Sequence, residues 1–197
     1  MRRGRAAVAL VGLVLAGCSY GQPRVSVSTA TTTPVPRVAF VTIGSDATSG
    51  ADVDNALHDL WSQRLFAAAL PPQAVFVNLA TRGATASDAL REQVPVALEL
   101  HPTIVTVWLT GDLDAGTPAG AYEADLTRVI EQMQAAGATV LVAQGRPFDP
   151  VADRVAARTG ATPVDLSGVS AGVAGSDAEQ TAIASAFEPS LRVPART

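Results

Sequence analysis

The sequence contains no lysine, and its 14 basic residues are all arginine. Eighteen acidic residues outnumber them and give a formal net charge of −4 at pH 7. Proteins that bind nucleic acids usually carry a basic face, so this balance argues against a nucleic-acid partner. The absence of lysine also excludes a phosphate-binding P-loop, because that motif needs a lysine to reach the phosphates.

Cysteine and histidine are almost as scarce. The single cysteine excludes a disulfide within the chain and a cysteine-based zinc site. Only two histidines, His58 and His101, are available as catalytic bases or metal ligands. No dinucleotide-binding glycine pattern follows the first predicted strand, and we expect no cofactor. The length of 197 residues and the 48% hydrophobic content fit one globular domain with additional terminal segments.

The first 17 residues predict a lipoprotein signal peptide. A basic start over residues 1–5 precedes an apolar run from Ala6 to Ala16, which is too short to span a bilayer. The run ends in Leu15-Ala16-Gly17-Cys18, which resembles the bacterial lipobox. We expect acyl chains on Cys18 to anchor the protein in a membrane. The alternative is an ordinary secretory signal in which the cysteine has no role.

The predicted lipid anchor also indicates where the protein is located and how its segments are arranged along the chain. The abundance of alanine and the absence of lysine are typical of high-GC coding, so we expect the outer face of the cytoplasmic membrane of a high-GC bacterium. Residues 18–36 are rich in Ser, Thr and Pro and predict an extended tether. Residues 37–190 are expected to form the folded domain, and residues 191–197 a C-terminal tail.

Within the domain, short apolar runs alternate with helical patterns. Strands are predicted at 37–43, 74–79, 103–109, 139–143 and 163–166, and helices at 55–70, 87–98, 122–136, 150–159 and 177–187. Ser87 and Asp177 are expected as N-caps, and Pro189 beyond the end of the last helix. This alternation predicts an α/β fold with one parallel sheet covered by helices on both faces. Ligands of such sheets bind beyond the carboxyl ends of the strands.

The loops at those ends carry a family resemblance. Gly44-Ser45-Asp46 follows the first strand, residues 78–85 (NLATRGAT) follow the second, and Thr110-Gly111-Asp112 follows the third. In order and spacing these segments resemble the first three sequence blocks of the SGNH (GDSL-type) hydrolases, a family of esterases and lipases. The resemblance implies a flavodoxin-like, three-layer α/β/α fold with a five-stranded parallel sheet. It also implies that the amide of Gly83 helps to hold an oxyanion.

Three departures from that family pattern affect the catalytic residues. The family's first block reads Gly-Asp-Ser with the serine as nucleophile, but here Asp46 stands at the nucleophile position and Ser45 one residue earlier. Gly111 stands where the family has an asparagine that donates to the oxyanion. The family's last block is Asp-x-x-His, which supplies the general base, yet residues 164–187 contain no histidine. The resemblance therefore implies a family member whose catalytic motifs are degenerate.

The chemistry of serine nucleophiles leaves three hypotheses. A serine hydroxyl needs a nearby base, and we expect neither histidine to reach Ser45. The first hypothesis is a membrane-anchored lipoprotein with weak or no hydrolysis that binds a small ester, a lipid or a glycan, or acts in the cell envelope. The alternative is an active carboxylic-ester hydrolase that uses Ser45 with an unconventional base. The third is a metal-dependent or structural envelope protein, with Asp46, Asp112 and Asp149 as candidate ligands.

Overall fold

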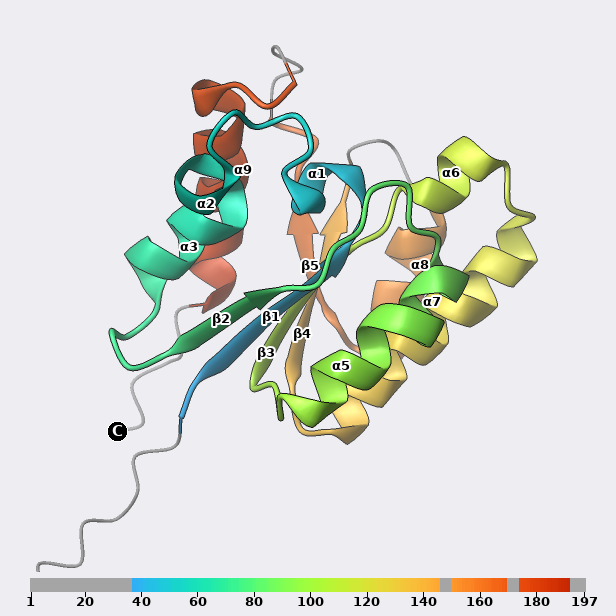
Figure 1. Cartoon of the computed structure of the whole chain (residues 1–197). Coiled ribbons are helices and arrows are strands. Elements are labelled where there is room, and N and C mark those ends of the chain that lie inside the picture. Colours follow the sequence, from blue (N-terminus) through green and yellow to red (C-terminus); the bar gives the residue numbers. More distant parts are fainter. Residues whose placement is uncertain (1–36, 146–149, 170–173, 192–197) are drawn as a thin grey trace, which may run out of the picture. The chain divides into compact units, whose positions relative to one another are not determined.

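The computed structural model describes residues 37–145, 150–169 and 174–191. Cys18, the tether, Asp149 and residues 192–197 of the predicted tail lie outside the described residues, whereas Leu191, the first residue of that tail, ends the last helix. Five parallel strands form one sheet in the order β2-β1-β3-β4-β5 (Figure 1). They are β1 (Ala39–Gly44), β2 (Val75–Asn78), β3 (Ile104–Trp108), β4 (Thr139–Gln144) and β5 (Thr162–Asp165).

Helices cover both faces of this sheet, so the predicted α/β fold is confirmed (Figure 1). One face packs against α3 (Trp61–Ala69) and α9 (Asp177–Leu191), and the short α2 (Ala56–Asp59), which has no buried residue, precedes α3. The other face packs against α4 (Ala86–Asp88), the π-helical turn η1 (Ala89–Gln93), α5 (Val94–Glu99), α7 (Ala119–Ala135) and α8 (Pro150–Thr159). Two short helices, α1 (Asp46–Ser49) and α6 (Gly111–Ala115), lie at the carboxyl ends of β1 and β3.

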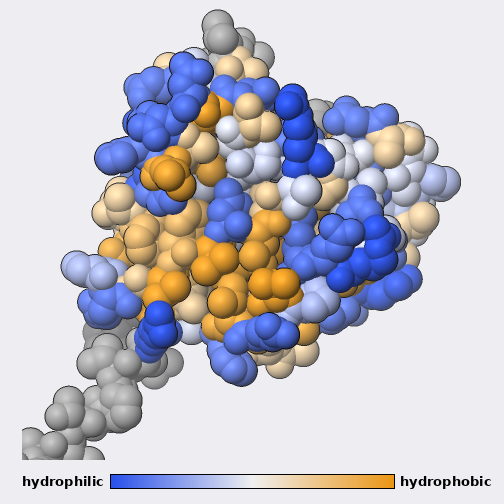
Figure 2. Space-filling model, viewed as in Figure 1, coloured by the Kyte–Doolittle hydropathy of each residue, from blue (hydrophilic) through white to orange (hydrophobic). Residues whose placement is uncertain are grey.

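The strand pattern places a hydrophobic core on each side of the sheet. Every residue of β1 and β3 is buried, and successive side chains enter opposite cores because side chains alternate along a strand. Val105 and Val107 join the core below α7, whereas Ile104 and Trp108 join the core below α3 and α9. Edge strand β2 is only half-buried, and Figure 2 shows apolar residues exposed over this edge and the neighbouring α5.

The predicted strands are all confirmed, but four predicted helices differ in detail. The helix predicted from Tyr122 begins three residues earlier, at Ala119. The helix predicted over 55–70 divides into α2 and α3, because Leu60 is extended (φ −62°, ψ 137°). The N-cap of the next helical segment is Thr85 and not Ser87. The Thr85 hydroxyl accepts from the Asp88 amide while the Asp88 carboxylate accepts from the Thr85 amide. Pro189 lies inside α9, which continues to the buried Leu191.

The strand order makes β1 and β3 the place where the direction of the chain across the sheet reverses. From β1 the chain passes to β2 on one side, and the following strands add on the other side. At such a reversal the loops after the two strands diverge and leave a crevice. The three segments that resemble SGNH blocks follow β1, β2 and β3, so they lie at the same edge of the sheet as this crevice. Among the described residues, none of the helices has the length and apolar character needed to cross a membrane.

Candidate active site

The turn after β1 is held rigidly by its neighbours. The Gly44 amide donates to Gln93 Oε1 (2.9 Å), and Gln93 Nε2 donates back to the Gly44 carbonyl (3.0 Å). Gln93 reaches this position from the π-helical turn and is 3% exposed. A Cβ atom at residue 44 would lie 2.7 Å from the Thr48 side chain and 2.8 Å from the Trp108 carbonyl oxygen. Only glycine therefore fits at this turn.

Ser45 points into the seam between β1 and β3. Its amide donates to the Trp108 carbonyl (3.1 Å), and the residue is 1% exposed. The Ser45 hydroxyl accepts from the Thr110 amide (2.8 Å) and shares a second hydrogen bond with Thr110 Oγ1 (2.7 Å). These bonds occupy the hydroxyl in a buried position. Ser45 is not among the residues that line the cavity described below.

Asp46, the first residue of α1, occupies the position that the family gives to the nucleophile. Its Oδ2 accepts the amide hydrogen of Gly83 (3.0 Å), and its Oδ1 lies 3.4 Å from Arg82 Nε. Arg82 also lies 3.5 Å from Asp52. Gly83 adopts a left-handed conformation (φ 68°), which presents its amide to the carboxylate. The predicted oxyanion donor is therefore bonded to a negatively charged group of the protein itself.

Gly111, the second predicted oxyanion residue, has no room for a side chain. A Cβ atom there would lie 2.4 Å from the carbonyl oxygens of both Gly83 and Ala84. The loop after β2 thus packs directly against the start of α6. An asparagine side chain cannot occupy this position unless the backbone shifts.

The three aspartates proposed as metal ligands do not form a described site. Asp46 bonds with Gly83, whereas Asp112 is 3% exposed and accepts from the Ala86 amide (2.5 Å). Asp149 lies outside the described residues. Within the described part of the chain, no group of three or more His, Cys, Asp or Glu side chains is arranged to hold a metal ion.

Asp112 is instead a buried structural acid. Burial raises the pKa of its carboxyl above the ordinary value, against the opposing effects of hydrogen bonds from the Ala86 amide and the Thr117 side chain. Asp88 shows the opposite behaviour, because hydrogen bonds from the Thr85 side chain and amide lower the pKa of its carboxyl. The two acids support adjacent segments of the loop after β2.

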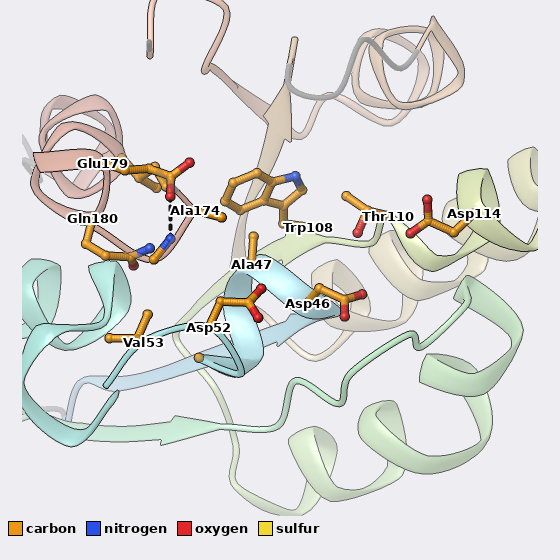
Figure 3. Close-up of a pocket in the computed structure, with 13 residues that line it drawn as sticks. Asp46, Ala47, Asp52, Val53, Trp108, Thr110, Asp114, Ala174, Glu179 and Gln180 are labelled. Carbon is orange, nitrogen blue, oxygen red and sulfur yellow. Dashed lines mark hydrogen bonds between the residues drawn. The ribbon is translucent and has the colours of Figure 1, made fainter. Parts of the chain in front are cut away.

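A cavity of about 260 Å³ opens beside Asp46 at the crevice between β1 and β3 (Figure 3). Its lining comes from the segment after β1, from the end of β3 and α6, and from residues 174–183 at the start of α9. The residues are Asp46, Ala47, Gly50, Asp52, Val53, Trp108, Thr110, Asp114, Ala174, Gly175, Glu179, Gln180 and Ile183.

Sequence reasoning identified Asp46 at this edge but missed the other residues that line the cavity. Trp108 belongs to the apolar run predicted as the third strand, a pattern that indicates a core position. At 8% exposed, it contributes both to the core and to the cavity wall. Glu179 and Gln180 carry an ordinary helical signal, and nothing local shows that α9 brings them to β1. Gln180 Oε1 accepts the Trp61 amide (2.8 Å), a contact between residues 119 positions apart.

The two histidines take no part in the cavity. His58 is exposed on α2, and His101 is exposed in the turn before β3, where its backbone has a positive φ of 50°. Because His101 precedes β3, it lies at the amino end of the strand, opposite to the cavity. Neither histidine lines the cavity, and the chain has no other.

Comparisons with known proteins match this arrangement to a family. The model of the GDSL-like Lipase/Acylhydrolase family matches residues 41–178. The crystal structure of TesA shares 19% identity with a TM-score of 0.62, covering 78% of this chain and 98% of that one. The psychrotrophic esterase EstA from Pseudoalteromonas sp. shares 18% identity (TM-score 0.60; 78% and 96% covered). A catalytic mutant of the acetylxylan esterase Axe2 from Geobacillus stearothermophilus shares 17% identity (TM-score 0.61; 79% and 94% covered).

At these identities the structures show the fold alone, and the predicted SGNH hydrolase-like architecture is confirmed. A search of curated proteins by sequence gives no match.

Gly111→Asn tests whether the missing oxyanion donor can be restored. We expect it to lower the free energy of unfolding by about 1–3 kcal/mol, because the side chain collides with two backbone carbonyls, and to produce no ester hydrolysis. Urea unfolding and an esterase assay measure the two effects. Gly120→Asn is the matched control, since Gly120 lies on α7 with open space around it. A Gly111→Asn protein as stable as this control would contradict the collision.

Asp112→Asn tests the buried acid through the pH dependence of stability. Because the folded-state pKa is raised, the aspartate's contribution to stability is fully present below its ordinary pKa of 3.8 and is lost as pH rises through the raised value. The free energy of unfolding of Asp112→Asn relative to wild type should therefore increase between about pH 3 and pH 7.

Urea unfolding at several pH values measures this trend, with Asp88→Asn as a control of opposite sign. The lowered pKa of Asp88 gives stability that is present above the ordinary pKa and lost as pH falls. The relative stability of Asp88→Asn should therefore decrease as pH rises. Parallel trends in the two variants would show that burial does not dominate at Asp112.

Proposed function

The chain belongs to the GDSL-like lipase/acylhydrolase family, and we propose that it binds a ligand at the family's reaction site without hydrolysing an ester. The hydrogen bond from the Gly83 amide to the Asp46 carboxylate carries this proposal. An oxyanion hole accelerates acyl transfer by offering unpaired donors to a developing negative charge. Here the donor already has a charged partner, and that partner would repel an oxyanion.

The position of Ser45 supports the same proposal. A serine nucleophile must approach a substrate carbonyl and pass its proton to a base. The Ser45 hydroxyl is buried, bonds twice to Thr110 and does not line the cavity. The described cavity lining also contains no histidine. For Ser45 to act as an esterase nucleophile, its side chain would have to turn into the cavity, and a general base would have to be supplied beside it.

We further propose that the domain works at a membrane surface. The lipobox-like Leu15-Ala16-Gly17-Cys18 would attach acyl chains to Cys18, and residues 18–36 would join the anchor to the domain. A chain anchored in this way would have its domain on the outer face of the cytoplasmic membrane, where small esters, lipids and glycans are available. The protein would act as an anchored binding protein of the cell envelope.

Hydrolysis of short p-nitrophenyl esters tests the absence of catalysis. We expect the full chain, purified in a nonionic detergent, to hydrolyse p-nitrophenyl acetate and butyrate no faster than its Ser45→Ala and Asp46→Ala variants. The physical reason is that the described residues do not bring an exposed nucleophile, a base and a vacant oxyanion donor together in one place. A fluorophosphonate label should react with none of the three proteins.

The matched control is Ser87→Ala, which removes an exposed hydroxyl on α4, away from the cavity. Turnover that is lost in Ser45→Ala but kept in Ser87→Ala, together with a label on Ser45, would establish the esterase alternative instead.

Cys18→Ala tests the anchor. Expressed in a bacterium with the lipoprotein pathway, the wild-type chain should incorporate radiolabelled palmitate and sediment with membranes. The variant should incorporate none and lose its membrane attachment, because Cys18 is the only cysteine in the chain. Membrane sedimentation that is equal in both proteins, without palmitate in either, would contradict lipidation at this residue.

A further inference from the structure

We infer that the ligand of the cavity beside Asp46 is a small organic cation with an apolar body. This inference rests on the proposed binding function and specifies its ligand class. The site is the concave cavity of about 260 Å³ at the reversal point of the sheet, and its charged residues decide which ligand it favours.

The cavity is bounded by segments distant in sequence. The loop after β1 forms one wall, the end of β3 and the start of α6 a second, and residues 174–183 a third (Figure 3). The buried contact from Gln180 to Trp61 fixes the start of α9 against α3. Trp61 Nε1 also donates to the Ala47 carbonyl (3.0 Å), which fixes α1 against the same helix. The walls are thus preformed.

All charged side chains in the described lining of the cavity are acidic. Asp46, Asp52, Asp114 and Glu179 contribute carboxylates, and none of the described lining residues is an arginine or a histidine. The nearby Arg82, whose side chain is 67% exposed, pairs with Asp46 and Asp52 from outside the lining. The charges of the described lining are therefore negative, and within the described residues Arg82 is shared between two of these acids. An anionic ligand would be repelled, whereas a cation would gain attraction.

The remaining wall of the cavity is apolar. The Trp108 indole stands at its centre in Figure 3, between Ala174 and Ala47. Val53 and Ile183 extend this apolar surface. An indole face attracts cations, most strongly those that carry little bound water, such as alkylated ammonium groups. A ligand with an ammonium head and an apolar body would contact both the carboxylates and the indole.

A metal ion is a poorer occupant than an organic cation. Metal ions of the calcium or magnesium type need several oxygen ligands around one point. The described residues hold no such group of three or more carboxylates or imidazoles. Glu179 accepts the Gly175 amide (2.8 Å) and Asp46 accepts the Gly83 amide, so the carboxylates point to separate partners. Carboxylates that are spread around an apolar wall suit a larger cation whose charge is distributed over several atoms.

Binding of three probes of similar size tests this inference. Benzyltrimethylammonium, benzyl alcohol and phenylacetate differ mainly in charge, and calorimetry or tryptophan fluorescence on the full chain in nonionic detergent measures their affinities. We expect the cation to bind more tightly than the alcohol, phenylacetate to bind least, and the affinity of the cation to fall as salt is added.

The double variant Asp52→Asn/Asp114→Asn should weaken binding of the cation roughly three- to tenfold and leave benzyl alcohol unchanged, because it removes two partly exposed charges. Both residues line the cavity but lie outside the Ser45 and Gly83 contacts. The matched control is Asp153→Asn, on the exposed side of α8 and away from the cavity. Thermal unfolding checks that all variants fold.

Failure of this inference is distinguishable from failure of the proposed function. No binding of the cation, preference for phenylacetate, or a double variant that binds the cation like wild type would overturn the inference. Ester turnover that depends on Ser45 would overturn the proposed non-hydrolytic function, whatever the probes do.

Discussion

The two hydrogen bonds between Gln93 and Gly44 determine the geometry on which the site depends. They hold the last peptide of β1 in a buried position where a side chain at residue 44 would collide with β3. An unpaired buried amide would be costly, so this contact fixes the turn. With the turn fixed, Ser45 faces the seam between the strands and Asp46 faces the cavity. The π-helical turn before Pro95 is what brings Gln93 to this position.

Once the turn is fixed, the order of Ser45 and Asp46 determines which side chain lies beside the Gly83 amide. A hydroxyl at position 46 would lie beside the Gly83 amide, at the mouth of the cavity. The carboxylate found there bonds to that amide and adds a negative charge to the rim. The loop after β2 also occupies the space of any side chain at Gly111. Under the proposed function, the first feature would disfavour a developing anion and favour a cation, and the second would leave no place for a further oxyanion donor.

The sequence predicted the sheet well because each strand is a short apolar run with turn residues on both sides. It predicted helix ends less well, since these depend on contacts beyond the local pattern. Leu60 leaves the helical conformation where the buried Trp61 amide donates to Gln180 of α9. Thr85, and not Ser87, is the N-cap because Thr85 and Asp88 each accept a hydrogen bond from the backbone amide of the other. Neither contact can be inferred from the local pattern of apolar residues.

The sequence by itself determined the strand order along the chain, the loops that reach the carboxyl edge, and the departures at Asp46 and Gly111. These follow from residue type, spacing and the alternation of strand and helix. Only the tertiary structure decided that the Ser45 hydroxyl is buried, that Asp46 bonds to the Gly83 amide, and that α9 closes an acidic cavity around Trp108. The reason is physical: such contacts join residues tens of positions apart, and their geometry exists only after the layers have packed.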